Sequence, residues 1–168
     1  VPASPPAALP VVTFSDRITF HLNGDEVRVR HVEHAHTDGD AMIHFVKAKV
    51  IHMGDVFFHG SYPFIDVSSG GSLDGVIAAA RSVLEIADEE TRIIPGHGPL
   101  ATRSDLVRYV ALLEKVRDRV RPLIDQGLTA DELVARRPTR IWDRKWGQGF
   151  MKPDVWVRLL HQAARPKP

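Results

Sequence analysis

Hydrophobic and polar residues alternate along the first third of the chain, as they do in half-buried β-strands. Apolar side chains occupy every second position of residues 18–22, and a second alternating run follows the dipeptide Asn23-Gly24. Asn-Gly between two such runs is typical of a two-residue β-hairpin turn. Two further short apolar runs flank residues 47–49. Residues 11–55 are therefore predicted to form antiparallel β-sheet.

The apolar spacing changes to that of an α-helix after Ser72. Apolar residues recur every three or four positions through residues 73–87, and Ser72 stands where an N-cap is needed. The segment TRIIP, residues 91–95, predicts a short buried strand that ends at its proline. A longer helix is expected from about Ser104, and Pro122 should kink or restart it because proline lacks a backbone N–H.

The last part of the chain is predicted to be mostly helical. Thr129 and Glu132 have the spacing of a capping box, and Asp154 is in a position to cap a final helix. Between them WDRKWGQGF, residues 142–150, is expected to be an aromatic loop. Strands followed by helices predict an α/β layered fold in which an antiparallel or mixed sheet is covered by helices.

The composition limits the size of the domain and the kinds of partner. A chain of 168 residues that is 43% hydrophobic can form one domain with a sizeable core, which we assign to residues 11–168. Residues 1–10, VPASPPAALP, read as a Pro/Ala-rich linker, and the opening valine suggests that another segment precedes it. No apolar run approaches the roughly 20 residues that a membrane helix needs.

The charge and the absence of cysteine narrow the chemistry. A formal net charge of +1 favours a small-molecule partner over nucleic acid or an anionic membrane, and the basic run Arg136, Arg137 and Arg140 reads as a solvated surface. Without cysteine, any metal must be bound by histidine and carboxylate side chains. The sequence leaves the compartment open, with the bacterial periplasm and the cytoplasm as the alternatives.

Three polar residues stand at predicted strand ends, where loops build functional sites. They are His36, Asp55 and His97, and together they are a plausible zinc-binding set. The alternative is that they are three unrelated turn residues. Most of the other histidines fall within predicted strands or helices and are expected to be structural, whereas His59 follows a strand end and is a weaker candidate for the site.

Three motifs in this order, AHTDGD, IHMGDVFF and IIPGHGP, resemble the C-terminal half of a metallo-β-lactamase superfamily hydrolase. The resemblance runs from about Val11 to about Asp125. It implies half of an αββα sandwich and, in the intact enzyme, two zinc ions whose bound hydroxide cleaves a cyclic amide, an ester or a thioester. The resemblance is also to the members of the superfamily that have an aspartate at the position of Asp55. Many dedicated β-lactamases have Cys or Ser there instead.

The segment EHAHTDGDA, residues 33–41, fits two motifs of that family. His34, His36 and Asp38 mimic the main metal loop, His-x-His-x-Asp-His, but Gly39 stands where its last histidine should be. In the second assignment only His36 is a ligand, and it belongs to the later single-histidine motif. The order of motifs favours the second assignment, because a strand pair follows at once and leads directly to Asp55.

The resemblance then implies a role for each residue. His36 would complete the first metal's ligand set, Asp55 would bridge both metals and set their spacing, and His97 would bind the second metal. Thr37 and Asp38 would orient His36. Further residues expected beside the substrate or behind the ligands are His34, His59, Tyr62 and Phe64.

The main metal loop is absent from the 168 residues, so each zinc would keep at most two protein ligands from this chain. A catalytic zinc normally has three protein ligands and a water. We therefore expect little or no zinc in the isolated chain, no activity, and an N-terminal half that has been lost or exists as a separate chain.

Two other classes of function stay open. The chain could be a non-catalytic binding or assembly module, which would expose apolar strand surface and form a homodimer to cover it. It could also be a di-iron redox relative, since iron uses similar histidine and carboxylate ligands.

Overall fold

The computed structural model describes residues 4–164, in which six strands form one mixed sheet in the order β1-β2-β3-β4-β5-β6. The strands are β1 (Arg17–Leu22), β2 (Asp25–Val32), β3 (Asp40–Phe45), β4 (Val50–Phe58), β5 (Arg92–His97) and β6 (Ala101–Thr102). Neighbouring strands are antiparallel except β4 and β5, which are parallel. The predicted hairpin is confirmed: Asn23 and Gly24 both have positive φ, 54° and 74°, as a type I′ turn requires.

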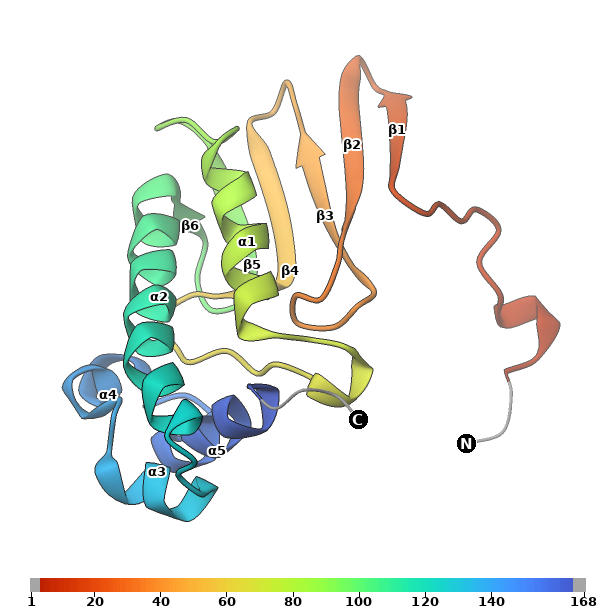
Figure 1. Cartoon of the computed structure of the whole chain (residues 1–168). Helices are drawn as coiled ribbons and strands as arrows, with labels where there is room; N and C mark the ends of the chain where they lie inside the picture. Colours follow the sequence, from red (N-terminus) through yellow and green to blue (C-terminus); the bar gives the residue numbers. More distant parts are fainter. Residues whose placement is uncertain (1–3, 165–168) are drawn as a thin grey trace.

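Five α-helices follow the first four strands within the described residues, and Figure 1 shows α1 and α2 packed on one face of the sheet with α3 to α5 gathered at one end. Their bounds are α1 (Leu73–Leu84), α2 (Arg103–Asp125), α3 (Ala130–Arg136), α4 (Arg140–Trp146) and α5 (Pro153–Ala163). Two short 3-10 turns, η1 (Pro6–Ala8) and η2 (Val67–Ser69), complete the elements. None of the helices between residues 4 and 164 combines the length and the apolar character that crossing a membrane requires.

Two predicted helix starts are confirmed by their caps. The Ser72 hydroxyl accepts a hydrogen bond from the Gly75 N–H at 3.0 Å, and Thr129 and Glu132 form the expected capping box of α3. Such caps satisfy N–H groups that have no partner in the first turn of a helix.

Two predictions for the later helices were wrong, and one alternative of a third is excluded. Helix α2 continues through Pro122 to Asp125 and does not restart there, because a proline in the last turn removes only one hydrogen bond near the frayed end; a kink at Pro122 stays a prediction. Helix α4 occupies part of the expected aromatic loop. Helix α5 is capped at Lys152, with Pro153 in its first turn, so Asp154 lies inside the helix and does not cap it.

The core lies between the sheet and helices α1 and α2. Ile51 and Met53 of β4 are buried there, together with Val76 and Val83 of α1 and Leu113 of α2. Successive side chains of a strand point to opposite faces, so the neighbours of these strand residues face away from the helices.

The opposite face of the sheet carries a group of apolar residues, together with His31 and His52, and has no helix over it within residues 4–164 (Figure 1). Cross-strand partners lie on the same face, which places these residues together there: Ile18 with Val29, Phe20 with Val27, Val29 with Ile43, and Phe45 with Val50. All are half-buried except Phe20, which is 37% exposed. We call these residues the open sheet face. Polar residues of the same strands, among them Arg28 and Arg30, point toward the helix side.

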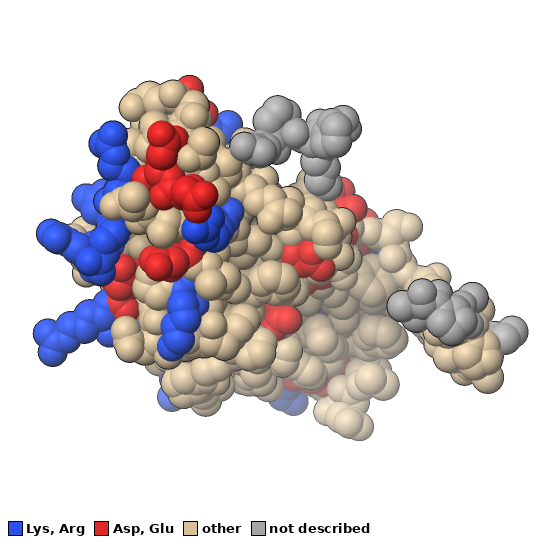
Figure 2. All heavy atoms as spheres, turned by 90° about the horizontal axis from the view of Figure 1, so that it is seen from below, with Lys and Arg blue, Asp and Glu red and all other residues tan. Residues whose placement is uncertain are grey.

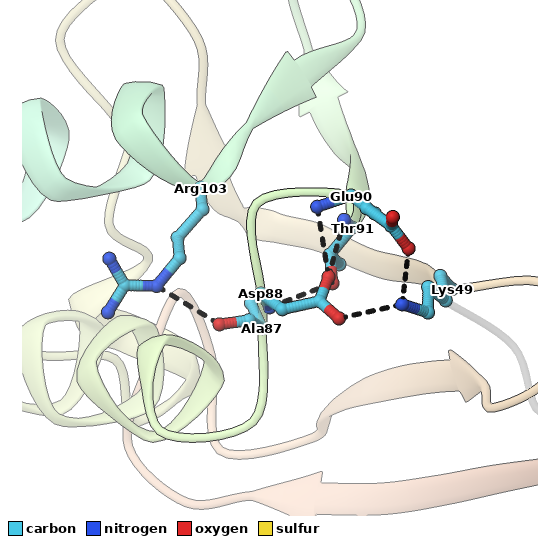
Figure 3. Close-up of polar contacts among 6 residues, drawn as sticks. All are labelled: Lys49, Ala87, Asp88, Glu90, Thr91 and Arg103. Carbon is cyan, nitrogen blue, oxygen red and sulfur yellow. Dashed lines mark hydrogen bonds and ion pairs between the residues drawn. The ribbon is translucent and has the colours of Figure 1, made fainter.

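The loop between α1 and β5 is held by charged contacts at the start of the β4–β5 pair (Figure 3). The Lys49 ammonium contacts the carboxylates of Asp88 and Glu90, with 2.9 Å to Asp88, and the Arg103 guanidinium donates to the Ala87 carbonyl at 3.0 Å. The Lys49 carbonyl also accepts from the Arg92 N–H at 2.9 Å. These contacts fix where β5 begins beside β4.

We expect Asp88→Asn to weaken this loop in a pH-dependent way. Hydrogen bonds from Lys49 and Thr91 hold the pKa of Asp88 at about 2, below its ordinary 3.8. A carboxylate with a depressed pKa contributes stability above its unfolded-state pKa, and that contribution is lost as the pH falls through the folded-state value. In circular dichroism melts, the Tm difference between wild type and variant should therefore shrink from about pH 4 to about pH 2.

Glu89→Gln is the matched control, because Glu89 lies in the same loop, is exposed and only approaches Arg103 at 3.9 Å. Its Tm difference from wild type should stay close to zero. A Tm difference for Asp88→Asn that does not change down to pH 2 would contradict the assignment.

Candidate functional site

Asp55 lies at an irregular point inside β4. The pairing of β4 with β5 shifts register between His52 and Gly54 and again between Gly54 and Phe58, and Gly54 has a φ of 52°. A residue other than glycine is strained at this φ. The expectation that Asp55 follows the strand end was therefore wrong, since β4 continues to Phe58, but the bulge interrupts the ladder at the same place.

The structure brings His36, Asp55 and His97 together. One carboxylate oxygen of Asp55, Oδ2, lies 3.6 Å from His36 Nε2, and the other, Oδ1, lies 3.4 Å from His97 Nε2. His97 is the last residue of β5 and lies opposite Phe58, so the strand runs two residues past Pro95, where the sequence predicted its end. Asp55 thus presents a different oxygen to each imidazole.

His36 is oriented by the main chain behind it. Its Nδ1 lies 3.0 Å from the Phe64 carbonyl, which can only accept, so Nδ1 is the donor in this hydrogen bond and Nε2 faces Asp55. The Phe64 ring meets the imidazole edge-on at 5.6 Å. Metal-binding histidines commonly make such a hydrogen bond through their other nitrogen.

His34 points elsewhere, although it is only two residues away. It has a positive φ of 51°, and its Nδ1 lies 3.1 Å from Asp38 Oδ1 and 3.2 Å from the Gly70 carbonyl. The loop is shaped further by Thr37, whose hydroxyl accepts from the Gly39 N–H at 3.0 Å. The hydrogen bonds of Thr37 and Asp38 therefore shape the loop that carries His36, and their role in orienting its ring stays a prediction.

His59 lies behind His97 and clamps the turn that follows it. The His59 N–H donates to the His97 carbonyl at 2.8 Å, His59 Nδ1 lies 2.9 Å from the Pro99 carbonyl, and Nε2 lies 3.3 Å from Asp105 Oδ1. Gly98 has a φ of 99°, and a Cβ there would lie 2.3 Å from the His59 carbonyl. His59 therefore contacts the backbone that presents His97.

The two aromatic candidates have different surroundings. Tyr62 is fully buried, stacks on Trp156 with ring centroids 4.0 Å apart, and donates to Asp143 Oδ1 at 2.8 Å. Burial raises the pKa of its hydroxyl, and its position is that of a core residue. Phe64 is 36% exposed beside His36, which leaves it able to contact a substrate.

One further aromatic residue near the site was missed by the sequence reasoning. Phe150 is 64% exposed, and its ring centroid lies 6.1 Å from that of His97 and 6.1 Å from that of Phe58. It belongs to the segment between α4 and α5, and no motif links that segment to the three strand-end residues. Only the packing of the C-terminal helices places it here.

The donors of these three residues fit zinc in type. Imidazole nitrogen and carboxylate oxygen are both ordinary zinc ligands. Within residues 4–164, no group of three His, Cys, Asp or Glu side chains is placed to hold one metal ion. What this chain offers is two pairs, His36 with Asp55 and Asp55 with His97.

Gly96 in the PGHG turn leaves room for the Asp55 carboxylate. A Cβ at position 96 would lie 2.1 Å from Asp55 Oδ1 and 2.7 Å from the Gly54 carbonyl, closer than atoms can approach. A side chain at position 96 would therefore collide with Asp55, and only glycine fits there.

We expect Gly96→Ala to push Asp55 away from the two imidazoles. Overpacking of this kind costs about 1–3 kcal/mol of unfolding free energy, which urea denaturation measures. The ring resonances of His36 and His97 should shift in NMR spectra. Gly39→Ala is the control, since a Cβ there meets only the Thr37 hydroxyl at 3.8 Å. Equal stability and unchanged resonances in Gly96→Ala would contradict the close approach.

Comparisons with known proteins agree with this architecture. A metallo-beta-lactamase from Pontibacter korlensis superposes with a TM-score of 0.54 at 21% identity, covering 62% of this chain and 49% of its own. The stereoselective inverting sec-alkylsulfatase Pisa1 from Pseudomonas sp. superposes with a TM-score of 0.66 at 18% identity, covering 90% of this chain and 26% of its own. The chain thus spans about half of the first protein and about a quarter of the second.

The sequence itself also matches a family model. No curated protein sequence matches the chain. The model of the metallo-beta-lactamase superfamily, however, matches residues 2–97, more than half of the chain and as far as the second predicted histidine ligand. The chain therefore belongs to the metallo-β-lactamase superfamily.

Proposed function

We propose that this chain supplies one side of the two-metal centre of a zinc-dependent hydrolase. The observation that carries the proposal is the position of Asp55, whose two carboxylate oxygens face the Nε2 atoms of His36 and His97 separately. A bridging carboxylate between two imidazoles is the arrangement expected when each imidazole binds a different metal ion. His36 and Asp55 would hold one zinc, and Asp55 and His97 the other.

Zinc ions bound here would supply Lewis acidity and a water with a pKa near 7. The residues of this chain would do the positioning. Asp55 would set the distance between the two ions, and the Phe64 carbonyl would keep the proton of His36 on Nδ1 so that Nε2 stays free to bind. Two ligands per ion fall short of the three of a catalytic zinc, so this chain alone would not be a competent enzyme.

The surroundings favour a substrate with an apolar part next to the bond that is cut. Phe64 and Phe150 are exposed large hydrophobic residues beside the two imidazoles, and they would line one wall of the pocket. We propose a lactone, a thioester or a cyclic amide as the small-molecule substrate. The carboxylate of Asp55, where dedicated β-lactamases often have Cys or Ser, favours the first two.

The remaining ligands would come from a further polypeptide segment, joined to this chain or separate from it. The open sheet face is a suitable surface for such a segment, because the apolar residues of four strands lie there without cover from the described residues. Apolar patches of this kind commonly mark an interface. The same segment would then bury this face and complete the metal centre when it binds.

Titration with Co²⁺ tests the ligand assignment in the chain as it is. In isothermal titration calorimetry we expect the unmodified chain to have two weak Co²⁺ sites. The His36→Ala and His97→Ala variants should each keep one site, and Asp55→Ala should have none. His34→Ala is the matched control, because His34 lies in the same loop and points away from Asp55; it should keep both sites. Equal losses in His34→Ala and His36→Ala would contradict the assignment.

Coexpression with any segment encoded upstream in the same gene should give two tightly bound zinc ions and hydrolysis of a lactone, a thioester or nitrocefin. Hydrolysis by the 168-residue chain alone would show that the ligand count is wrong.

A second candidate function is an assembly module without catalysis, which the open sheet face favours. In that case the isolated chain would form a homodimer through this face, and replacing Val29 and Phe45 with lysine would convert it to a monomer in sedimentation velocity. Zinc would be absent from the intact protein. A zinc content of two ions per molecule would decide in favour of the hydrolase.

A further inference from the structure

Four arginines surround a hollow at the end of the molecule where α3 and α4 meet α2. Arg119 comes from α2, Arg136 is the last residue of α3, Arg137 is its C-cap, and Arg140 is the first residue of α4. The hollow has a volume of about 530 Å³. Figure 2, which views the molecule from this end, shows Lys and Arg side chains gathered along its left side. We call these four residues the arginine hollow.

Within residues 4–164, no carboxylate lies at ion-pair distance from the four arginines of the hollow. Most arginines of the neighbouring surface have an acidic partner: Arg117 pairs with Asp118 and Asp74, Arg121 with Asp125, and Arg158 with Asp131. Among the described residues, none of the four arginines of the hollow forms such an ion pair. Arg119 donates to the Pro138 carbonyl at 3.2 Å.

Two acidic side chains close in sequence to these arginines have hydrogen-bonding partners of their own. Hydrogen bonds from Thr129 lower the pKa of Glu132, and the charge of Arg136 lowers it a little further. Glu132 accepts from the hydroxyl and the N–H of Thr129 in the capping box of α3, and Asp118 pairs with Arg117. Four like charges held around one hollow repel each other unless an anion lies between them.

Arg137 occupies its position at a conformational cost. It is the C-cap of α3 with a φ of 47° and a ψ of 55°, the left-handed conformation in which glycine is usual. Its N–H donates to the Val134 carbonyl, as a glycine at this position would do equally well. The local backbone therefore gives no reason for an arginine here.

The rim of the hollow adds apolar and planar surface. Ile141 is 62% exposed at the hollow, and Trp142 lies next to it, half-buried, with the Arg119 guanidinium 5.0 Å from its ring centroid. Tryptophan and arginine planes both stack on planar groups.

From these features we infer that the arginine hollow binds a small molecule that carries a diphosphate group. Guanidinium groups pair with phosphate oxygens through two parallel hydrogen bonds, and a diphosphate offers enough charge and enough oxygens for several of them. The hollow is large enough for a diphosphate and part of the group attached to it. Ile141 and Trp142 would contact that attached group, which favours a nucleotide over free pyrophosphate. The inference uses none of the proposed metal ligands.

Isothermal titration calorimetry with ADP and with inorganic pyrophosphate, at equal ionic strength, tests the inference on the whole chain. We expect both to bind and ADP to bind more tightly. Arg137→Gly should weaken binding about tenfold, the usual effect of losing one charge-assisted hydrogen-bonding group. Its Tm should stay equal to that of wild type or rise, because glycine relieves the left-handed backbone.

Arg144→Gln is the matched control, since Arg144 lies on α4 and is exposed but does not line the hollow. Its affinity for ADP should equal that of wild type. Three results would each overturn the inference. One is no binding of either probe, and another is an equal loss of affinity in Arg144→Gln and Arg137→Gly. The last is tighter binding of a single-stranded RNA that Arg144→Gln weakens as much as Arg137→Gly, because that pattern describes a general basic surface.

Discussion

The parallel pairing of β4 with β5, interrupted at Gly54, is the constraint on which the candidate site depends. A parallel pair needs a long connection, here α1 and the loops around it, and this connection carries β5 back beside β4. The register shift frees Asp55 from the ladder, and the absence of a side chain at Gly96 lets the carboxylate come close to the neighbouring strand. The contacts of Lys49 at one end of the pair and of His59 at the other fix the position of β5 along β4.

Much of this arrangement could be predicted from local signals. The Asn23-Gly24 turn, the Ser72 cap and the capping box at Thr129 each act within a few residues, so the sequence alone reveals them. The site was harder to predict. The three predicted ligands lie together in the structure, and their role as ligands stays a prediction. Asp55 was expected at a strand end, because a strand that continues past a bulge has the same local pattern as one that stops.

Other parts of the site depend on long-range packing and could not be predicted. Phe150 reaches His97 because α3, α4 and α5 fold back under the sheet, and no spacing in the sequence encodes that distance. Tyr62 lies only two residues from Phe64, yet it is buried against Trp156 while Phe64 stays exposed. That no described carboxylate lies at ion-pair distance from the four arginines also follows from tertiary structure, since the basic run alone is typical of a solvated surface.

The hydrogen bond between His36 and the Phe64 carbonyl makes this half of the proposed centre preorganised. The ring is held by that carbonyl and by the edge of the Phe64 ring, in a loop whose backbone is tied down by the Asp66 N–H, which donates to the His36 carbonyl at 2.8 Å. Orienting a side chain costs conformational entropy. Here that entropy is lost when the chain folds and not when a ligand binds. The binding free energy of a ligand of this imidazole would therefore be more favourable by the same amount.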